Sequence, residues 1–168
     1  MIHIYTGDGK GKTTAGMGLC LRAAGAGKKV LINQFLKDGH SSERRILEEV
    51  PNIDLVPGPD HMKFTSAMTE EEKQALTATY RVFLKTVERH VQGFDVIFFD
   101  EILYAIGKKF VSEQQVLDLV LAFPEKEWIL TGRYDGGALW DAADYISVIK
   151  KERHPFDRGV AARKGVEY

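Results

Sequence analysis

A glycine- and lysine-rich segment near the start of the chain carries the clearest chemistry in the sequence. Residues 6–14 read Thr-Gly-Asp-Gly-Lys-Gly-Lys-Thr-Thr, after the short run Met1–Tyr5 and before a stretch rich in alanine, glycine, leucine and methionine. Glycines let a backbone bend closely around a phosphate, and the N–H groups at the start of a helix point at such an anion. The segment therefore predicts a phosphate-binding loop between a strand and a helix, built for a nucleoside triphosphate.

The residue types in this loop indicate separate tasks. Lys12 can reach the outer phosphates, and the Thr13 hydroxyl can bind Mg²⁺. The residues expected around the nucleotide are Gly7, Asp8, Gly9, Lys10, Gly11, Lys12, Thr13 and Thr14. The loop departs from the usual G-x-x-x-x-G-K-[ST] pattern, because Thr6 stands at the first glycine position and the glycine follows one place later. We expect an altered phosphate geometry; the alternative interpretation is a glycine- and lysine-rich surface turn.

Two carboxylates, Asp100 and Glu101, follow the apolar residues 96–99. A hard divalent ion prefers oxygen ligands, and phosphate-binding loops are commonly paired with an acidic residue at the end of a strand. We expect one of the two carboxylates to bind Mg²⁺ together with Thr13 and the other to have a structural role, such as capping the next helix. Glu101 is the predicted metal ligand and Asp100 the alternative.

Three further polar residues follow predicted strands. Arg133 comes after the run 128–131, and a guanidinium there can pair with phosphate through two hydrogen bonds. Gln34 and Lys37 lie at the end of the predicted strand 30–35. We favour a nucleotide contact for Arg133 over a plain surface position, and we include Gln34 and Lys37 in the predicted binding site.

Strands and helices alternate along the chain, which favours a mostly parallel sheet covered by helices on both faces. The predicted fold is a three-layer, P-loop NTPase-like α/β domain spanning residues 1–168. Ligands of such sheets bind at the carboxyl ends of the strands, so the predicted site residues can converge at one edge. Beyond the strands already named we expect strands at 53–56 and 145–149, helices at 42–49, 69–91, 112–123 and 139–143, and a loop-like tail from His154 onward.

Composition narrows the functional classes. The chain has 168 residues with a formal net charge of −1. It has no basic block, so nothing points to nucleic-acid binding, and it has no apolar run long enough to span a membrane. Its single cysteine, Cys20, fits a reducing cytoplasm and is expected in the core. The start of the chain does not look like a signal peptide.

Taken together, several segments make the chain resemble the P-loop type of ATP:corrinoid adenosyltransferase, also called cob(I)alamin adenosyltransferase. The segments that carry the resemblance are residues 6–14, 34–37, 99–105, 131–133, 143–144, 154–156 and 164–168. They cover nearly the whole chain in order. The family often has tryptophan where Ser66 stands, and it often has Asn-Ala-Pro after Thr-Gly-Arg, where this chain has residues 134–136.

The resemblance implies that Co(I) of a reduced corrinoid, cobalamin or cobinamide, attacks the 5′ carbon of ATP and that triphosphate leaves. Catalysis then needs positioning and charge neutralisation, which we assign to Lys12 and Arg133. The irregular loop around Phe64 is expected to contact the corrinoid; alternatively Phe64 packs the loop onto the body. The resemblance also implies a homodimer, and a reductase protein is a candidate partner. The open alternatives are another P-loop ATPase or phosphotransferase, and a non-catalytic nucleotide-binding module.

Overall fold

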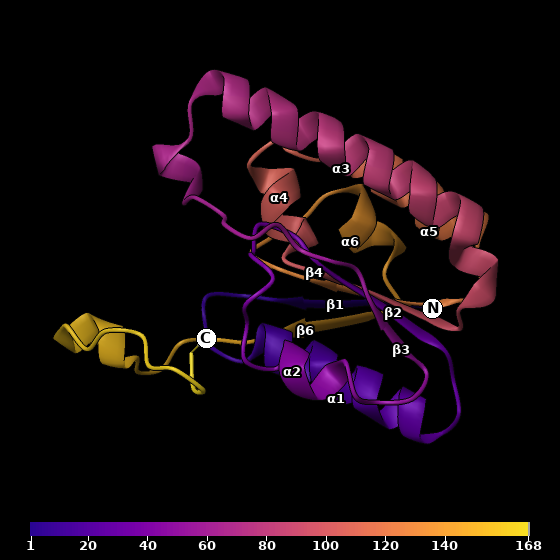
Figure 1. Ribbon diagram of the computed structural model, residues 1–168, viewed down its shortest axis with the longest axis horizontal. Helices are drawn as coiled ribbons and strands as arrows, with labels where there is room; N and C mark the ends of the chain where they lie inside the picture. Colours follow the sequence, from indigo (N-terminus) through magenta and orange to yellow (C-terminus); the bar gives the residue numbers. More distant parts are fainter. Residues whose placement is uncertain (168) are drawn as a thin grey trace.

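A six-stranded sheet, in which every pair of neighbouring strands is parallel, forms the middle layer of the molecule (Figure 1). The computed structural model describes residues 1–167; Tyr168, the last residue of the tail motif, lies outside the described residues. The strand order is β3-β2-β4-β5-β1-β6. The strands are β1 (Ile2–Thr6), β2 (Val30–Gln34), β3 (Ile53–Leu55), β4 (Val96–Asp100), β5 (Glu127–Thr131) and β6 (Tyr145–Val148). The sheet confirms the predicted fold class.

Helices cover both faces of this sheet (Figure 1). On one face lie α1 (Lys12–Gly25) and the single-turn α2 (Arg44–Leu47). On the other lie α3 (Glu70–His90), α4 (Ile102–Gly107), α5 (Glu113–Ala122) and α6 (Ala138–Ala142). Short 3₁₀ turns occur at Thr65–Ala67, Val91–Gly93 and Pro155–Arg158, the last within the otherwise irregular tail. None of the helices in the described part is long and apolar enough to cross a membrane.

The central strands supply core residues to both faces because their side chains alternate. Phe99 of β4 points to the α3 side, where its ring lies 5.9 Å from that of Trp128. Phe98 points to the α1 side, together with Met17 and the fully buried Cys20, as predicted for that cysteine. A strand buried on both faces reads as an unbroken apolar run, which is why β4 was recognisable from sequence.

Local sequence signals set several helix ends. Thr69 and Glu72 form a complete capping box at the start of α3. The Ser112 hydroxyl accepts a hydrogen bond from the Gln115 N–H at the start of α5, as predicted. At the end of α4 the chain turns through Lys109, whose φ of 63° is a conformation usually taken by glycine.

Candidate nucleotide-binding site

The carboxyl ends of four neighbouring strands bring the predicted site residues to one edge of the sheet. Parallel register pairs Gln34 of β2 with Asp100 of β4, and Tyr5 of β1 with Thr131 of β5. The loop that follows β1 leaves from the same edge, at the left of Figure 1. The predicted convergence of strand ends is therefore present.

Two glycines shape the loop between β1 and α1. Gly7 has a φ of 106° and Gly11 a φ of 118°, and both values are in the left-handed region. Gly7 also lies so close to the Ile149 carbonyl that any Cβ there would collide with it. The Gly9 N–H donates to that same carbonyl at 2.8 Å. The loop is thus fastened to the segment that follows β6, and the position after Thr6 has to be glycine.

Thr6 stands at the first glycine position of the usual pattern because its hydroxyl binds another loop. Its Oγ1 donates to the Tyr134 carbonyl at 3.1 Å and accepts from the Tyr134 N–H at 3.0 Å. Thr6 is 2% exposed. One hydroxyl therefore joins the phosphate loop to the loop that carries Arg133, and sequence reasoning did not identify either partner as a site residue.

Lys12 lies within the loop and is held by the loop backbone. Its Nζ donates to the carbonyls of Gly7 at 2.9 Å and Gly9 at 2.8 Å. Burial lowers the pKa of Lys12, and the charge of Glu101 acts in the opposite direction. The ammonium group is therefore held against the loop backbone, and its predicted contact with the outer phosphates stays a prediction.

The other polar residues of the loop have separate surroundings. Lys10 forms an ion pair with Glu167 of the tail at 3.3 Å. The Asp8 carboxylate accepts a hydrogen bond from the Lys151 N–H at 3.0 Å, and this bond lowers the pKa of Asp8. Thr14 is exposed at the start of α1, where the first N–H groups have no partner within the helix.

Asp100 is a completely buried carboxylate that is bonded by four side chains. It accepts from the hydroxyls of Thr13 at 2.9 Å and Thr131 at 2.7 Å. It also accepts from Lys37 at 2.7 Å and Gln34 at 3.4 Å. A buried charge needs such compensating hydrogen bonds. Asp100 therefore holds these four side chains together at the edge of the sheet. Thr131 belongs to this cluster but was not among the predicted site residues. A single hydroxyl residue at the end of an apolar strand is the signal that could have identified it.

Lys37 and Gln34 both lie inside this polar cluster. Burial lowers the pKa of Lys37, but the charge and hydrogen bond of Asp100 together with the charges of Glu101 and Glu43 outweigh it, so the pKa is raised. The Gln34 amide donates to Glu43 at 3.1 Å and accepts from Ser41 at 3.0 Å. The polar groups of Gln34 are thus bonded to protein partners, and its predicted nucleotide contact stays a prediction.

Glu101 has a different environment from its neighbour. It occupies the cap position of α4 with a φ of 60°, and its side chain makes no capping hydrogen bond, so the expectation that a carboxylate caps this helix is wrong. Its N–H donates to Thr131 at 2.9 Å, which holds the turn in place. Burial raises the pKa of Glu101, and the charge of Asp100 adds to the rise. The charges of Lys37, Lys12 and Arg133 act against that rise, so the carboxylate lies in the field of three cations.

The oxygen donors in this cluster fit a hard divalent ion. Thr13 and Asp100 lie 2.9 Å apart, and the carboxylate of Glu101 is adjacent in sequence and free of a capping bond. Hydroxyl and carboxylate oxygens are the ligands that Mg²⁺ takes beside phosphate oxygens. No group of three or more histidine, cysteine or acidic residues able to hold a metal occurs within residues 1–167.

Arg133 leaves the end of β5 in a tightly packed turn. The preceding Gly132 has a φ of 137°, and a Cβ there would lie 2.6 Å from the Tyr104 backbone nitrogen. Arg133 itself is exposed, and its charge influences the pKa values of both Lys12 and Glu101. The guanidinium is thus electrostatically coupled to the phosphate loop and to the predicted metal ligand.

The loop around Phe64 stands away from the core. The Phe64 side chain is 87% exposed, next to the short turn Thr65–Ala67. The alternative that Phe64 packs the loop onto the body is therefore wrong. This segment extends on the side of the molecule where the phosphate loop also lies, at the left of Figure 1.

Comparison with known proteins decides the family. The family model described as ATP:corrinoid adenosyltransferase BtuR/CobO/CobP matches residues 1–168, the whole chain. The chain belongs to the ATP:corrinoid adenosyltransferase family. Members of this family are transferases that act on ATP and a corrinoid, so membership confirms the resemblance stated from the sequence motifs and the predicted enzyme class.

Three curated relatives of this chain are named corrinoid adenosyltransferases, which agrees with the family match. The chain is 30% identical over 171 residues to a corrinoid adenosyltransferase of Escherichia coli strain K12, covering all of this chain and 85% of the relative. It is 29% identical over 169 residues to that of Salmonella typhimurium, again with 85% of the relative covered. The Pseudomonas aeruginosa corrinoid adenosyltransferase is 29% identical over 176 residues, with 83% covered.

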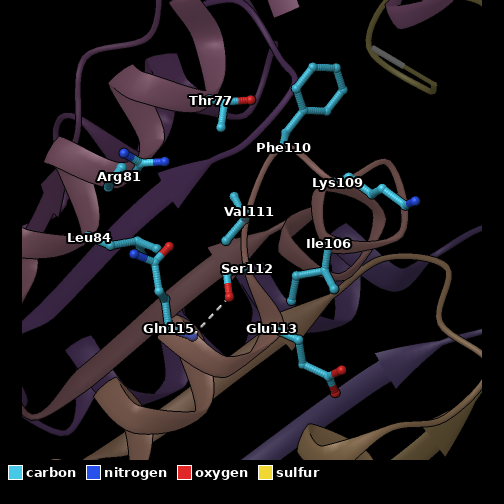
Figure 2. Close-up of a pocket in the computed structure, with 10 residues that line it drawn as sticks. All are labelled: Thr77, Arg81, Leu84, Ile106, Lys109, Phe110, Val111, Ser112, Glu113 and Gln115. Atoms are coloured by element: carbon cyan, nitrogen blue, oxygen red, sulfur yellow. Dashed lines mark hydrogen bonds between the residues drawn. The ribbon is translucent and has the colours of Figure 1, made fainter. Parts of the chain in front are cut away.

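A separate cavity of about 420 Å³ is lined by residues of α3, α4 and α5 and of the turn between α4 and α5 (Figure 2). Its lining comprises Thr77, Arg81, Leu84, Ile106, Lys109, Phe110, Val111, Ser112, Glu113 and Gln115. None of the predicted site residues belongs to this lining.

Proposed function

We propose that the edge of the sheet binds the triphosphate of ATP while the cobalt of a reduced corrinoid attacks the 5′ carbon. The family match over the whole chain carries this proposal. The phosphate loop, the two carboxylates at the end of β4 and Arg133 after β5 support it, because they lie at the same edge of the sheet.

The electron pair of Co(I) forms the new bond to the 5′ carbon, the bond from that carbon to the phosphate oxygen breaks, and triphosphate leaves with the electrons. This reaction needs no nucleophilic side chain. The single cysteine, Cys20, is fully buried, and burial raises the pKa of its thiol to about 12, which makes it inert. The protein's own contribution is to orient ATP and to neutralise the leaving triphosphate.

Two cations and the predicted metal ligands have separate tasks in this proposal. Lys12 and Arg133 stabilise the negative charge that develops on the triphosphate, and the N–H groups at the start of α1 add to that field. Thr13 and Glu101 would hold Mg²⁺, with Asp100 as the alternative ligand. When bound, Mg²⁺ neutralises charge on the phosphate oxygens.

The exposed Phe64 is proposed to cover one face of the corrinoid. An aromatic ring there keeps water, a competing axial ligand, away from cobalt and raises the share of four-coordinate cobalt, which is easier to reduce. Its 87% exposure supports a role toward a ligand, because a ring this exposed adds little to the core. A homodimer, a reductase protein as partner and a cytoplasmic location belong to the same proposal.

The test is to incubate the protein with ATP, Mg²⁺ and a chemically reduced corrinoid and to identify the phosphate product. Triphosphate together with an adenosylated corrinoid is the expected result. Orthophosphate would indicate a P-loop ATPase or phosphotransferase instead, and an absence of any product despite ATP binding would indicate a nucleotide-binding module.

A further inference from the structure

Arg133 is exposed and has no hydrogen-bond or ion-pair partner among residues 1–167. A long side chain of this kind samples many rotamers, and its ordering costs free energy when it binds an anion. Whatever fixes its backbone therefore determines how well it can meet a phosphate. The backbone next to Arg133 is held by the contacts of the following residue, Tyr134.

The backbone of Tyr134 is bonded to the phosphate loop, and its side chain is bonded to α5. Its N–H and carbonyl both pair with the Thr6 hydroxyl, directly before the loop. Its phenol O–H donates to the Glu113 carboxylate. The backbone of Tyr134 is thus held by Thr6, and its side chain is held by Glu113.

The Glu113 carboxylate bonds to the loop that follows Arg133 and not to the backbone of its own helix, α5. The same carboxylate oxygen also accepts from the Leu139 N–H at 3.0 Å, at the start of α6. In Figure 2 the carboxylate points away from Ser112 and Gln115, which bond each other across the first turn of α5. Glu113 therefore fastens the far side of the Arg133 loop at two points.

The glycine between these partners allows the contact. Gly137 has a φ of 143°, and a Cβ at this position would collide with both the Tyr134 hydroxyl and the Glu113 carboxylate. The close approach of phenol and carboxylate thus requires a residue without a side chain here. The sequence, the backbone conformation and the hydrogen bonds all favour the same arrangement.

We propose that Glu113 and Tyr134 are positioning residues that hold Arg133 toward the triphosphate of ATP. This inference rests on the proposed function of Arg133. The pair restricts the backbone on which Arg133 stands, so that less conformational freedom is lost when the guanidinium meets phosphate. The effect reaches the ligand only through Arg133.

The experiment measures binding of ATP and of inorganic triphosphate by calorimetry, with Mg²⁺ present. The variants are Tyr134→Phe, which removes only the hydroxyl, and Glu113→Leu, which removes the acceptor. Glu113→Gln is the rescue, since its amide oxygen can accept both bonds. Tyr145→Phe on the exposed face of β6 is the matched control. Thermal unfolding of each variant shows whether it is folded.

We expect Tyr134→Phe and Glu113→Leu to weaken triphosphate binding about tenfold, because a hydrogen bond to a charged group is lost. Glu113→Gln should recover most of that affinity, and Tyr145→Phe should bind as the unaltered protein does. In an Arg133→Ala background, Tyr134→Phe should not weaken triphosphate binding further, because the effects of substitutions at coupled residues do not add.

Two results separate the possible failures. If Arg133→Ala binds triphosphate normally, the proposed role of Arg133 is wrong, and the positioning role falls with it. If Arg133→Ala weakens binding but Tyr134→Phe does not, or weakens it equally in the Arg133→Ala background, then only the positioning role is overturned.

Discussion

Replacing Thr6 by valine tests the bond between the phosphate loop and the Arg133 loop. Valine keeps the shape and the strand preference of threonine but removes the hydroxyl. The change deletes both hydrogen bonds to Tyr134, at 3.1 and 3.0 Å. At about 0.5–1.5 kcal/mol for each bond, the loss in the free energy of unfolding is about 1–3 kcal/mol. Thr6 is 2% exposed, so water cannot easily replace the lost partner.

Urea unfolding of the protein without ligand measures this loss, and ATP calorimetry measures its effect on binding. Thr6→Ser is the control, because serine keeps the hydroxyl and gives up only a methyl group. Thr6→Gly restores the usual loop pattern, yet we expect it to be at least as destabilising as Thr6→Val, since glycine weakens a strand further. A Thr6→Val protein within about 0.5 kcal/mol of the unaltered one would refute the reasoning.

Four further changes address the site and its surroundings. Lys12→Ala should abolish turnover but leave the fold intact, through loss of a charge-assisted contact of about 1.5–3 kcal/mol or more; near-normal kcat at saturating ATP would exclude that role. Glu101→Gln should raise the Mg²⁺ concentration needed for half-maximal activity; if Asp100→Asn alone does so, the two carboxylates have exchanged roles. Phe64→Ala should impair reduction of the bound Co(II) corrinoid without changing the ATP dissociation constant, and the reverse pattern contradicts the proposed contact. Lys109→Gly should raise the free energy of unfolding by about 0.5–1 kcal/mol in urea titration, because it relieves the left-handed backbone there; a loss of stability would show that the lysine side chain compensates for that strain.

The local features of the sequence predicted much of the fold. The apolar run of β4 and the capping residues of α3 and α5 depend on neighbours a few positions away, so they could be recognised directly. The phosphate loop was recognisable for the same reason. Strand ends with polar residues predicted which edge of the sheet carries the site.

The contacts between distant segments were not predictable in this way. Asp100 and Glu101 are neighbours in sequence, yet one is bonded by four side chains and the other lies in the field of three cations. The bond between Tyr134 and Glu113 joins residues 21 positions apart. This bond forms only when the loop after β5 packs against α5. A short sequence motif cannot predict such a contact, because its two residues belong to separate segments.

The position of β1 in the sheet has a consequence for how the chain folds. Both neighbours of this first strand, β5 and β6, are made more than 100 residues later, and the loop after β1 is fastened by the Ile149 carbonyl. Contacts across such separations form slowly, because a long chain segment has to be closed first. During synthesis, β1 is made before both of its neighbours and would therefore acquire its final pairing only after they have emerged. A nascent chain that has not reached Ile149 would therefore lack a finished phosphate loop, and ATP would bind only after that residue has emerged.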